Sequence, residues 1–197
     1  MKKESQVIFD KNVIEFVTVA AEFCAFLERA ESMKRSTFVD TTLKILPLLY
    51  LKASMLPKCE MIGDESPETY VTEEIYEVLR INLASILAEK DDYLEVFLPD
   101  MAYSDEPIKK NISEDLADIY QDIKDFIFVF QLGLNETMND SLAICQENFG
   151  LLWGQKLVNT MRALHDVKYS PKARGEDEEE EEYEPENNED CHCEDDD

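Results

Sequence analysis

The sequence predicts an all-α protein, a bundle of about five main antiparallel helices followed by a disordered acidic C-terminal tail. Apolar residues recur every three or four positions over most of residues 10–169, the spacing of helices with one buried face. Capping and helix-ending residues separate these stretches, and mostly short connections favour antiparallel packing. Residues 170–197 lose the apolar period, and 15 of these 28 residues are acidic.

The first two helices are expected at residues 10–33 and 36–56. Asp10 is a suitable N-cap for the first, because its carboxylate can accept a bond from an early backbone N–H. The second is apolar on nearly every side after Leu43, so we expect it to be the most buried helix, at the centre of the bundle. Residues 1–9 are expected to be a flexible N-terminus.

A long connection, residues 57–71, leads to the third helix, which Thr72 opens and which runs to about Glu89. A short helical turn is then expected at residues 92–97. No period is visible over residues 100–111, which predicts a surface loop.

The fourth and fifth helices are expected to form an antiparallel pair. Ser113 should cap the fourth helix, whose apolar stripe continues to Phe130. Gly133 and Asn135 supply a C-cap and a new N-cap, which predicts a tight turn between the two helices. The fifth helix should then run without interruption to about Asp166.

The net charge of −26 is unevenly distributed. Residues 176–197 hold 15 acidic side chains and no lysine or arginine, which leaves the rest with 30 acidic against 19 basic side chains. Such a surface repels phosphate backbones and anionic lipids, so direct binding to nucleic acid or membrane is not expected. The tail cannot bury enough apolar surface to order itself.

The sequence indicates a cytoplasmic location. Charged residues interrupt the N-terminal stretch where an export signal needs an unbroken apolar segment. The longest uncharged apolar run, residues 45–51, is too short to span a bilayer. Five cysteines without framework spacing are typical of reduced thiols in a cytosol.

An aspartate strip on the fourth helix is the main candidate site. Its members fall on one helical face beside the apolar stripe: Asp115, Asp118, Asp122 and Asp125. Carboxylates in this arrangement could bind Mg²⁺, as in helical enzymes that hydrolyse nucleotide pyrophosphate bonds. The other interpretation is a solvated face of an amphipathic helix, and we expect the strip to be exposed.

A Mg²⁺ site of that kind also needs carboxylates from a second helix. The candidates are two pairs on other helices: Glu74 with Glu77, and Glu28 with Glu31. No lysine or arginine lies among the four aspartates to hold a phosphate, although Lys124 is near.

Other groups carry weaker signals. His165 is adjacent to Asp166, but neighbouring helical residues do not face each other, and Cys145 lies in the apolar seam. The tail holds three soft metal ligands, Cys191, His192 and Cys193, fewer than the four of a structural zinc site.

Trp153 lies between Gly150 and Gly154 and is expected either to pack in the core or to line a pocket. The two glycines, one turn apart, would let a neighbouring helix approach closely. Phosphate-cradling glycine loops and nucleophile-elbow motifs are absent from the sequence.

Three segments carry a resemblance to a known family. They are LPLLYLKASMLP (residues 46–57), DIYQDIKDFIFVFQLGLNETMNDSLAICQENFG (118–150) and GLLWGQKLVNTMRALH (150–165). Residues 8–169 resemble an uncharacterised all-helical family of Bacteroides-type bacteria, a domain of unknown function. The resemblance implies an all-helical cytosolic domain and carries no activity, cofactor or catalytic residue.

Two functions follow as hypotheses. The preferred one is a non-enzymatic interaction module, without cofactor, in which the bundle holds a partner protein and the acidic tail contacts something basic. The alternative is a Mg²⁺-dependent nucleotide pyrophosphohydrolase built on the aspartate strip. A further possibility is that the tail serves only solubility.

Overall fold

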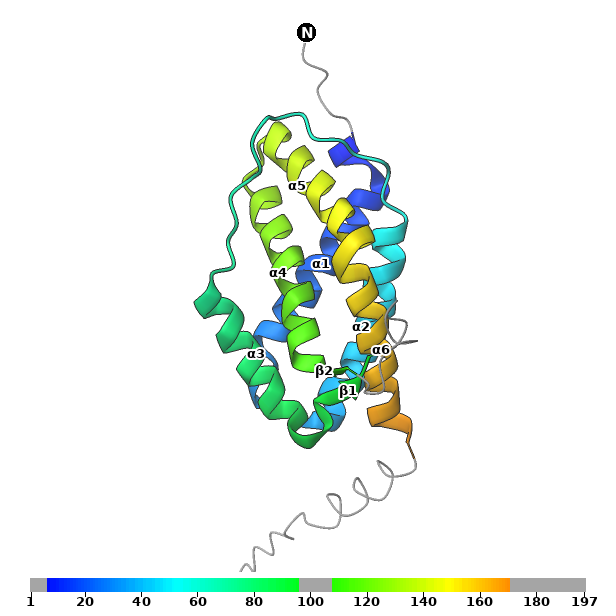
Figure 1. Ribbon diagram of the computed structural model, residues 1–197. Coiled ribbons are helices and arrows are strands. Elements are labelled where there is room, and N and C mark those ends of the chain that lie inside the picture. Colours follow the sequence, from blue (N-terminus) through cyan, green and yellow to red (C-terminus); the bar gives the residue numbers. More distant parts are fainter. Residues whose placement is uncertain (1–6, 96–107, 171–197) are drawn as a thin grey trace, which may run out of the picture.

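A computed structural model describes residues 7–95 and 108–170, which form a bundle of α-helices (Figure 1). The helices are α1 (Lys11–Glu28), α2 (Arg35–Ser54), α3 (Glu73–Leu87), α4 (Ile112–Gln131), α5 (Asn135–Asn148) and α6 (Gly154–Tyr169). The predicted all-α bundle is therefore confirmed. The acidic tail beyond residue 170 lies outside the described residues.

Helix α4 is the centre of the bundle, since it packs against α1, α3, α5 and α6. The expectation that α2 would be the most buried helix is wrong. Leu46 and Leu49 are fully buried, but Leu48 is 44% and Leu51 51% exposed. Helix α2 packs mainly against α1 and α6, and the described residues leave one of its apolar sides exposed. None of the described helices is long and apolar enough to cross a membrane.

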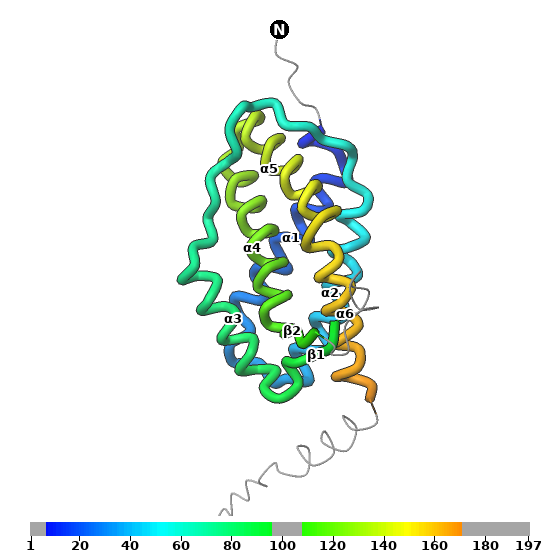
Figure 2. The backbone as a smooth tube through the Cα atoms, in the orientation of Figure 1, coloured from blue at the N-terminus to red at the C-terminus, as the bar shows by residue number. Residues whose placement is uncertain are grey.

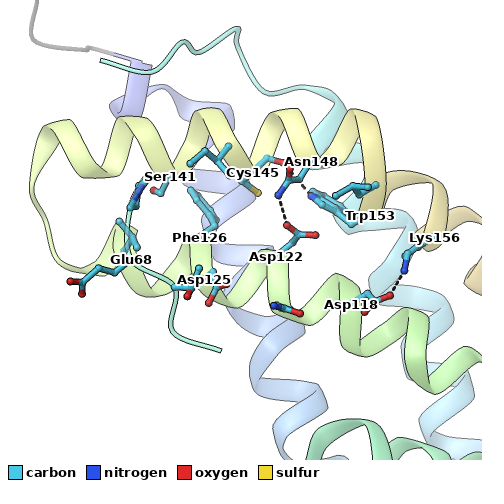
Figure 3. A pocket seen from close by; sticks show the side chains of 16 residues that line it. Glu68, Asp118, Asp122, Asp125, Phe126, Ser141, Cys145, Asn148, Trp153 and Lys156 are labelled. Carbon is cyan, nitrogen blue, oxygen red and sulfur yellow. Dashed lines mark hydrogen bonds and ion pairs between the residues drawn. The ribbon is translucent and has the colours of Figure 1, made fainter. Parts of the chain in front are cut away.

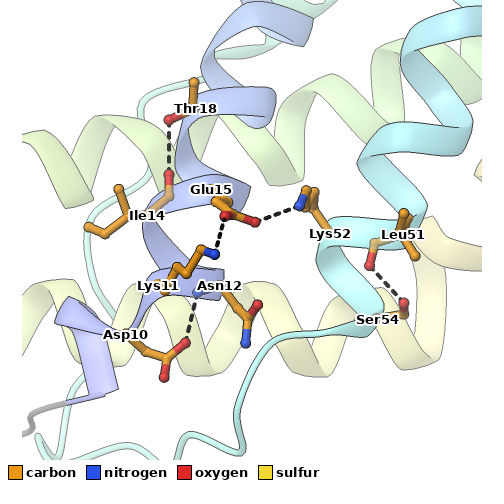
Figure 4. Close-up of polar contacts among 9 residues, drawn as sticks. All are labelled: Asp10, Lys11, Asn12, Ile14, Glu15, Thr18, Leu51, Lys52 and Ser54. Atoms are coloured by element: carbon orange, nitrogen blue, oxygen red, sulfur yellow. Dashed lines mark hydrogen bonds and ion pairs between the residues drawn. The ribbon is translucent and has the colours of Figure 1, made fainter.

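Several helix ends follow from local sequence. The Asp10 carboxylate accepts a bond of 2.8 Å from the Asn12 N–H, which confirms it as the α1 N-cap (Figure 4). Thr72 caps α3 as predicted, with its hydroxyl accepting from the Ile75 N–H. Gly133 has φ +74° in the turn between α4 and α5, a conformation that favours glycine.

The start of α4 is capped from outside the helix. Asn111 occupies the N-cap position, so the prediction of Ser113 was wrong. The buried Asp91 carboxylate accepts bonds of 2.7 Å from both the N–H and the hydroxyl of Ser113. A carboxylate at this position satisfies early backbone donors and favours the positive end of the helix dipole.

A small hairpin joins α3 to α4. Strands β1 (Asp92–Leu94) and β2 (Lys109–Asn111) are antiparallel, with Asp92 opposite Asn111. The helical turn expected at residues 92–97 is therefore a strand in its described part. The expected loop at residues 100–111 ends in a strand, and residues 96–107 lie outside the description.

The N-terminal part of the fold starts earlier than expected. Val7–Phe9 form a 3-10 turn, and the Ile8 side chain is fully buried in the core. These three residues belong to the bundle instead of to a flexible terminus. Residues 1–6 lie outside the described part of the chain.

The segment between α2 and α3, residues 55–72, crosses the end of the bundle and descends beside α4 (Figure 2). Side chains of α5 bind its backbone. Gln146 accepts from the Cys59 N–H at 3.1 Å, and the Asp140 carboxylate accepts from the Ile62 N–H at 2.7 Å. These contacts hold the segment against α5 and α4 without secondary structure of its own.

Candidate functional site

The four aspartates of the strip lie on one face of α4, but they are not exposed as expected. Asp115 is only 3% exposed, and Asp118, Asp122 and Asp125 are half-buried. Other elements cover this face and supply hydrogen-bond donors to every carboxylate. The expectation of an exposed strip was wrong because these donors are distant in the sequence.

The two N-terminal aspartates of the strip are bound by side chains of other elements. The Tyr93 hydroxyl of β1 donates to Asp115. Asp118 accepts from the Tyr76 hydroxyl of α3 at 2.7 Å through one oxygen and from the Lys156 ammonium of α6 through the other (Figure 3). These contacts attach α3, α6 and the hairpin to α4.

Among the described residues, donors reach only one oxygen of each of the other two aspartates. Asn148 donates to Oδ1 of Asp122 at 2.5 Å, and the N–H groups of Tyr70 and Val71 both donate to Oδ1 of Asp125 at 2.7 Å. Within the described residues, no donor contacts Oδ2 of either carboxylate. Asp122 and Asp125 therefore each have one oxygen with spare hydrogen-bonding capacity toward the groove.

These carboxylates line a groove of about 460 Å³ between α4, the α5–α6 helix and residues 67–69 (Figure 3). The size lies within the usual range of small-ligand pockets. Its polar lining consists of Glu68, Thr69, Asp118, Gln121, Asp122, Asp125, Ser141, Asn148 and Lys156. Its other lining residues are Pro67, Phe126, Val129, Ile144, Cys145, Leu152 and Trp153.

A π-helical turn, Phe149–Trp153, joins α5 to α6 beside this groove. The fifth helix of the prediction is thus continuous, but it contains an extra residue in one turn. Trp153 is fully buried under the groove, and its indole N–H donates to the Cys145 carbonyl at 3.1 Å. Such turns within α-helices are frequent at functional sites.

The glycines around Trp153 do not have the predicted role. A Cβ on Gly154 would lie 2.3 Å from the Phe149 carbonyl oxygen, so the close approach is within its own helix. At Gly150 a Cβ would meet nothing within 4 Å. Glycine at 154 is therefore required by the π-helical turn instead of by a neighbouring helix.

Burial raises the pKa of the Asp122 carboxyl above its usual value, and the charges of Asp125 and Asp118 add to this, against the bond from Asn148. Burial also raises the pKa of Asp125. Burial lowers the pKa of Lys156, but the bond and charge of Asp118 outweigh this and raise it. Burial and mutual repulsion therefore disfavour the ionised forms of Asp122 and Asp125.

The carboxylates expected to face the strip lie elsewhere. Glu77 pairs with Arg80 at 2.8 Å on its own helix, and Glu28 accepts from the Tyr120 hydroxyl at 2.8 Å and from Lys124 at 2.6 Å. Neither glutamate lines the groove. Within residues 7–95 and 108–170, no group of three or more His, Cys, Asp or Glu side chains is placed to hold a metal ion.

Of the partners that sequence analysis missed, Lys156 and Asn148 are the most important. No basic side chain was expected among the four aspartates, yet Lys156 contacts Asp118. Asn148 lies three residues after Cys145, a buried residue of the predicted seam, and Lys156 lies three residues after the buried Trp153. A polar side chain at that position lies at the edge of the buried face. This spacing is the one signal in the sequence that could have indicated Lys156 and Asn148 as partners of the strip.

The remaining candidates are His165, Cys145 and the cluster at residues 191–193. His165 is exposed, and its ring contacts Tyr169 with centroids 4.6 Å apart. Complete burial raises the pKa of the Cys145 thiol, which keeps it protonated. The cysteine and histidine cluster at residues 191–193 lies outside the described part of the chain.

Comparisons with known proteins agree with the fold. A crystal structure of protein BF1032 from Bacteroides fragilis, determined by a structural genomics consortium, is 93% identical, covers 86% of this chain and 99% of its own, and superposes with a TM-score of 0.78. No curated protein matched the chain. The family model described as "Domain of unknown function (DUF5063)" matches residues 7–170. The chain therefore belongs to the DUF5063 family.

Proposed function

We propose that this protein is a non-enzymatic, cytoplasmic interaction module that holds a basic segment of a partner protein in the groove on α4. The charge of the groove is the observation that carries the proposal. Four carboxylates line it, those of Glu68, Asp118, Asp122 and Asp125, against one lysine already bound to Asp118. A cationic side chain would supply the missing positive charge.

The groove also suits the apolar part of a basic side chain. Leu152 is 53% exposed at its rim, and Ile144 is partly exposed beside it. Lysine and arginine place their methylene groups along apolar surface while the charged end reaches a polar partner. The 15 carboxylates of residues 176–197 would attract the same basic partner at longer range.

The alternative, a Mg²⁺-dependent nucleotide pyrophosphohydrolase, has less support from the geometry. Both oxygens of Asp118 are bonded, and the facing glutamates that it needs do not line the groove. Mg²⁺-dependent loss of nucleoside triphosphate with the purified protein, abolished by Asp118→Asn with Asp122→Asn, would favour the enzyme instead.

The direct test is a titration of the full chain with a mixed lysine and arginine peptide. The only tryptophan, Trp153, lies under the groove, so its fluorescence reports on binding there. We expect an emission change that weakens as salt rises, because exposed charges are screened over about 8 Å at physiological ionic strength. An acidic peptide of equal length should give no change.

The matched variants are Asp122→Asn with Asp125→Asn, and Glu147→Gln. Asparagine keeps an Oδ1 for Asn148 and for the backbone of residues 70 and 71. Glu147 is exposed on α5 and does not line the groove, so its variant controls for the loss of one acidic charge, half of the change in the groove variant. Equal peptide binding by all three proteins would refute the groove as the binding site.

A further inference from the structure

Helices α2 and α6 are antiparallel neighbours that together present an exposed apolar face (Figure 1). Asp40 pairs with Lys168 near one end of the two helices. Tyr50 packs on Phe149 near the other end, with ring centroids 5.1 Å apart. Each helix carries a row of exposed side chains at spacings of four, three and four, opposite its buried side. The rows are Lys44, Leu48, Leu51 and Met55 on α2, and Leu151, Gln155, Val158 and Arg162 on α6 and the turn before it.

These eight residues, the α2–α6 face, have the pattern of a helix-pairing surface. Between 44% and 70% of each of the five apolar side chains is exposed among the described residues. Alternating spacings of three and four are those by which one helix packs along another. None of the eight residues lines the groove, so this face is a separate surface.

The α2–α6 face lacks acidic side chains in an otherwise acidic chain. Residues 44–55 and 151–162 contain no Asp or Glu, although the chain has 45 of them and a net charge of −26. Interface cores are likewise depleted of charged residues. Two copies of this chain repel each other through acidic surface, and a face without acidic side chains is where they can approach.

The order of side chains along α6 is complementary to itself. Leu151 and Val158 lie four positions before and three after Gln155, and Glu147 and Arg162 lie eight before and seven after. Two antiparallel copies centred on Gln155 therefore set Leu151 against the partner's Val158. They also set Glu147, which is exposed, against the partner's Arg162. A parallel copy would instead set arginine against arginine.

We propose that the α2–α6 face binds a second copy of this chain about a two-fold axis at Gln155, with α6 antiparallel to α6 of the partner subunit. A two-fold axis makes each contact twice, so one acid–base pair becomes two. Helix α2 then lies along α2 of the partner subunit, where Leu48, Leu51 and Met55 cover their counterparts. The groove stays open, and the dimer goes beyond the proposed function.

The size of the α2–α6 face suits a dimer. Two helices about 30 Å long and about 10 Å wide give a face of about 600 Å² in projection. Side chains corrugate this surface, so its accessible area approaches the about 800 Å² per partner that stable interfaces bury.

The first experiment measures the mass of the full chain by light scattering over a series of concentrations. We expect the mass to rise from 22.8 kDa, that of one chain, to twice that value. Leu151→Ser should raise the dissociation constant of the dimer about tenfold or more, because it removes two buried leucines. Leu134→Ser is the matched control, since Leu134 is 61% exposed in the turn between α4 and α5, outside the face.

The second experiment reverses the charges at the ends of the α6 row. Arg162→Glu alone and Glu147→Arg alone each set like charges against each other, and each should weaken the dimer about tenfold. The two substitutions together should restore the dissociation constant of the unchanged protein. All substituted positions are exposed, and circular dichroism confirms that each variant keeps its helices.

The outcomes decide the proposal. A mass of 22.8 kDa at every concentration would leave the face to a different occupant and overturn the dimer. A dimer that Leu151→Ser does not weaken has its interface elsewhere, which also overturns the proposal. Failure of the double charge reversal to restore association would overturn the antiparallel arrangement. Peptide binding in the groove should be the same in Leu151→Ser and in the unchanged protein, so the proposed function is tested separately.

Discussion

Replacing Gly154 with alanine tests whether a close contact fixes the π-helical turn beside the groove. The new Cβ would lie 2.3 Å from the Phe149 carbonyl oxygen and 2.9 Å from a ring carbon of the same residue. An ordinary carbon–oxygen contact is about 3.3 Å, so the backbone must move by about 1 Å. Overpacking of this kind costs about 1–3 kcal/mol.

Gly150→Ala is the matched control, because it is in the same turn and its Cβ meets nothing within 4 Å. Both substitutions gain the usual advantage of alanine over glycine in a helix, about 1 kcal/mol. The difference between the two variants therefore isolates the contact with Phe149. We expect Gly154→Ala to have a free energy of unfolding about 1–3 kcal/mol lower than that of Gly150→Ala.

Urea denaturation followed by circular dichroism measures this difference, and thermal unfolding should separate the variants by about 2–12 °C for a chain of this size. Trp153 fluorescence supplies a local readout, since its ring packs on Phe149 at 4.7 Å between centroids. Equal stabilities of the two variants would show that the turn tolerates a Cβ at both positions, contrary to the geometric argument.

Three further predictions concern the core, the groove and the tail. Leu46→Ala should cost about 2–5 kcal/mol and Leu48→Ala less than about 0.5 kcal/mol in urea denaturation, because Leu46 is fully buried and Leu48 is 44% exposed. Asp122→Asn with Asp125→Asn should raise the melting temperature at neutral pH. Burial raises the pKa of both carboxyls in the folded protein, so their ionisation lowers stability as pH rises through these pKa values. In a pH series, the rise in melting temperature of the variant should therefore vanish below the usual pKa of aspartate. Removal of residues 176–197 should leave the melting temperature unchanged or slightly higher, because it relieves charge repulsion. A basic partner held by the tail should be lost from pull-downs with the truncated protein, and also from pull-downs with the full chain at high salt. A lower melting temperature in the truncated protein would contradict a separable tail.

Local signals in the sequence were sufficient for most of the helical framework. Asp10 and Thr72 cap helices through their own side chains, and Gly133 ends α4 with a positive φ. Each of these depends on residues within a few positions of one another. The hairpin could not be predicted in this way, because β1 forms only against β2, on the far side of residues 96–107.

The burial of individual helix faces was less predictable. The apolar character of α2 on nearly every side does not reveal which face the other described helices cover, and Leu51 lies on a face that they leave exposed. The strip on α4 differs from its prediction in the opposite direction, because it was expected to be exposed and is covered. Asp115 and Asp118 have the pattern of a solvated face, but Tyr93 and Lys156 reach them from 22 and 38 residues away. Pairings at that separation leave no period in the sequence.

The segment at residues 55–72 depends for its attachment on helices that must already be assembled. Its Cys59, Ile62 and Tyr70 N–H groups bond to side chains of α5 and α4, among them Asp140 and Asp125. Those acceptors reach their relative positions only when α4 and α5 have paired. Its release breaks side-chain bonds and leaves the main-chain bonds of each helix intact. Local opening of this segment would therefore widen access to the groove at a free-energy cost well below that of global unfolding.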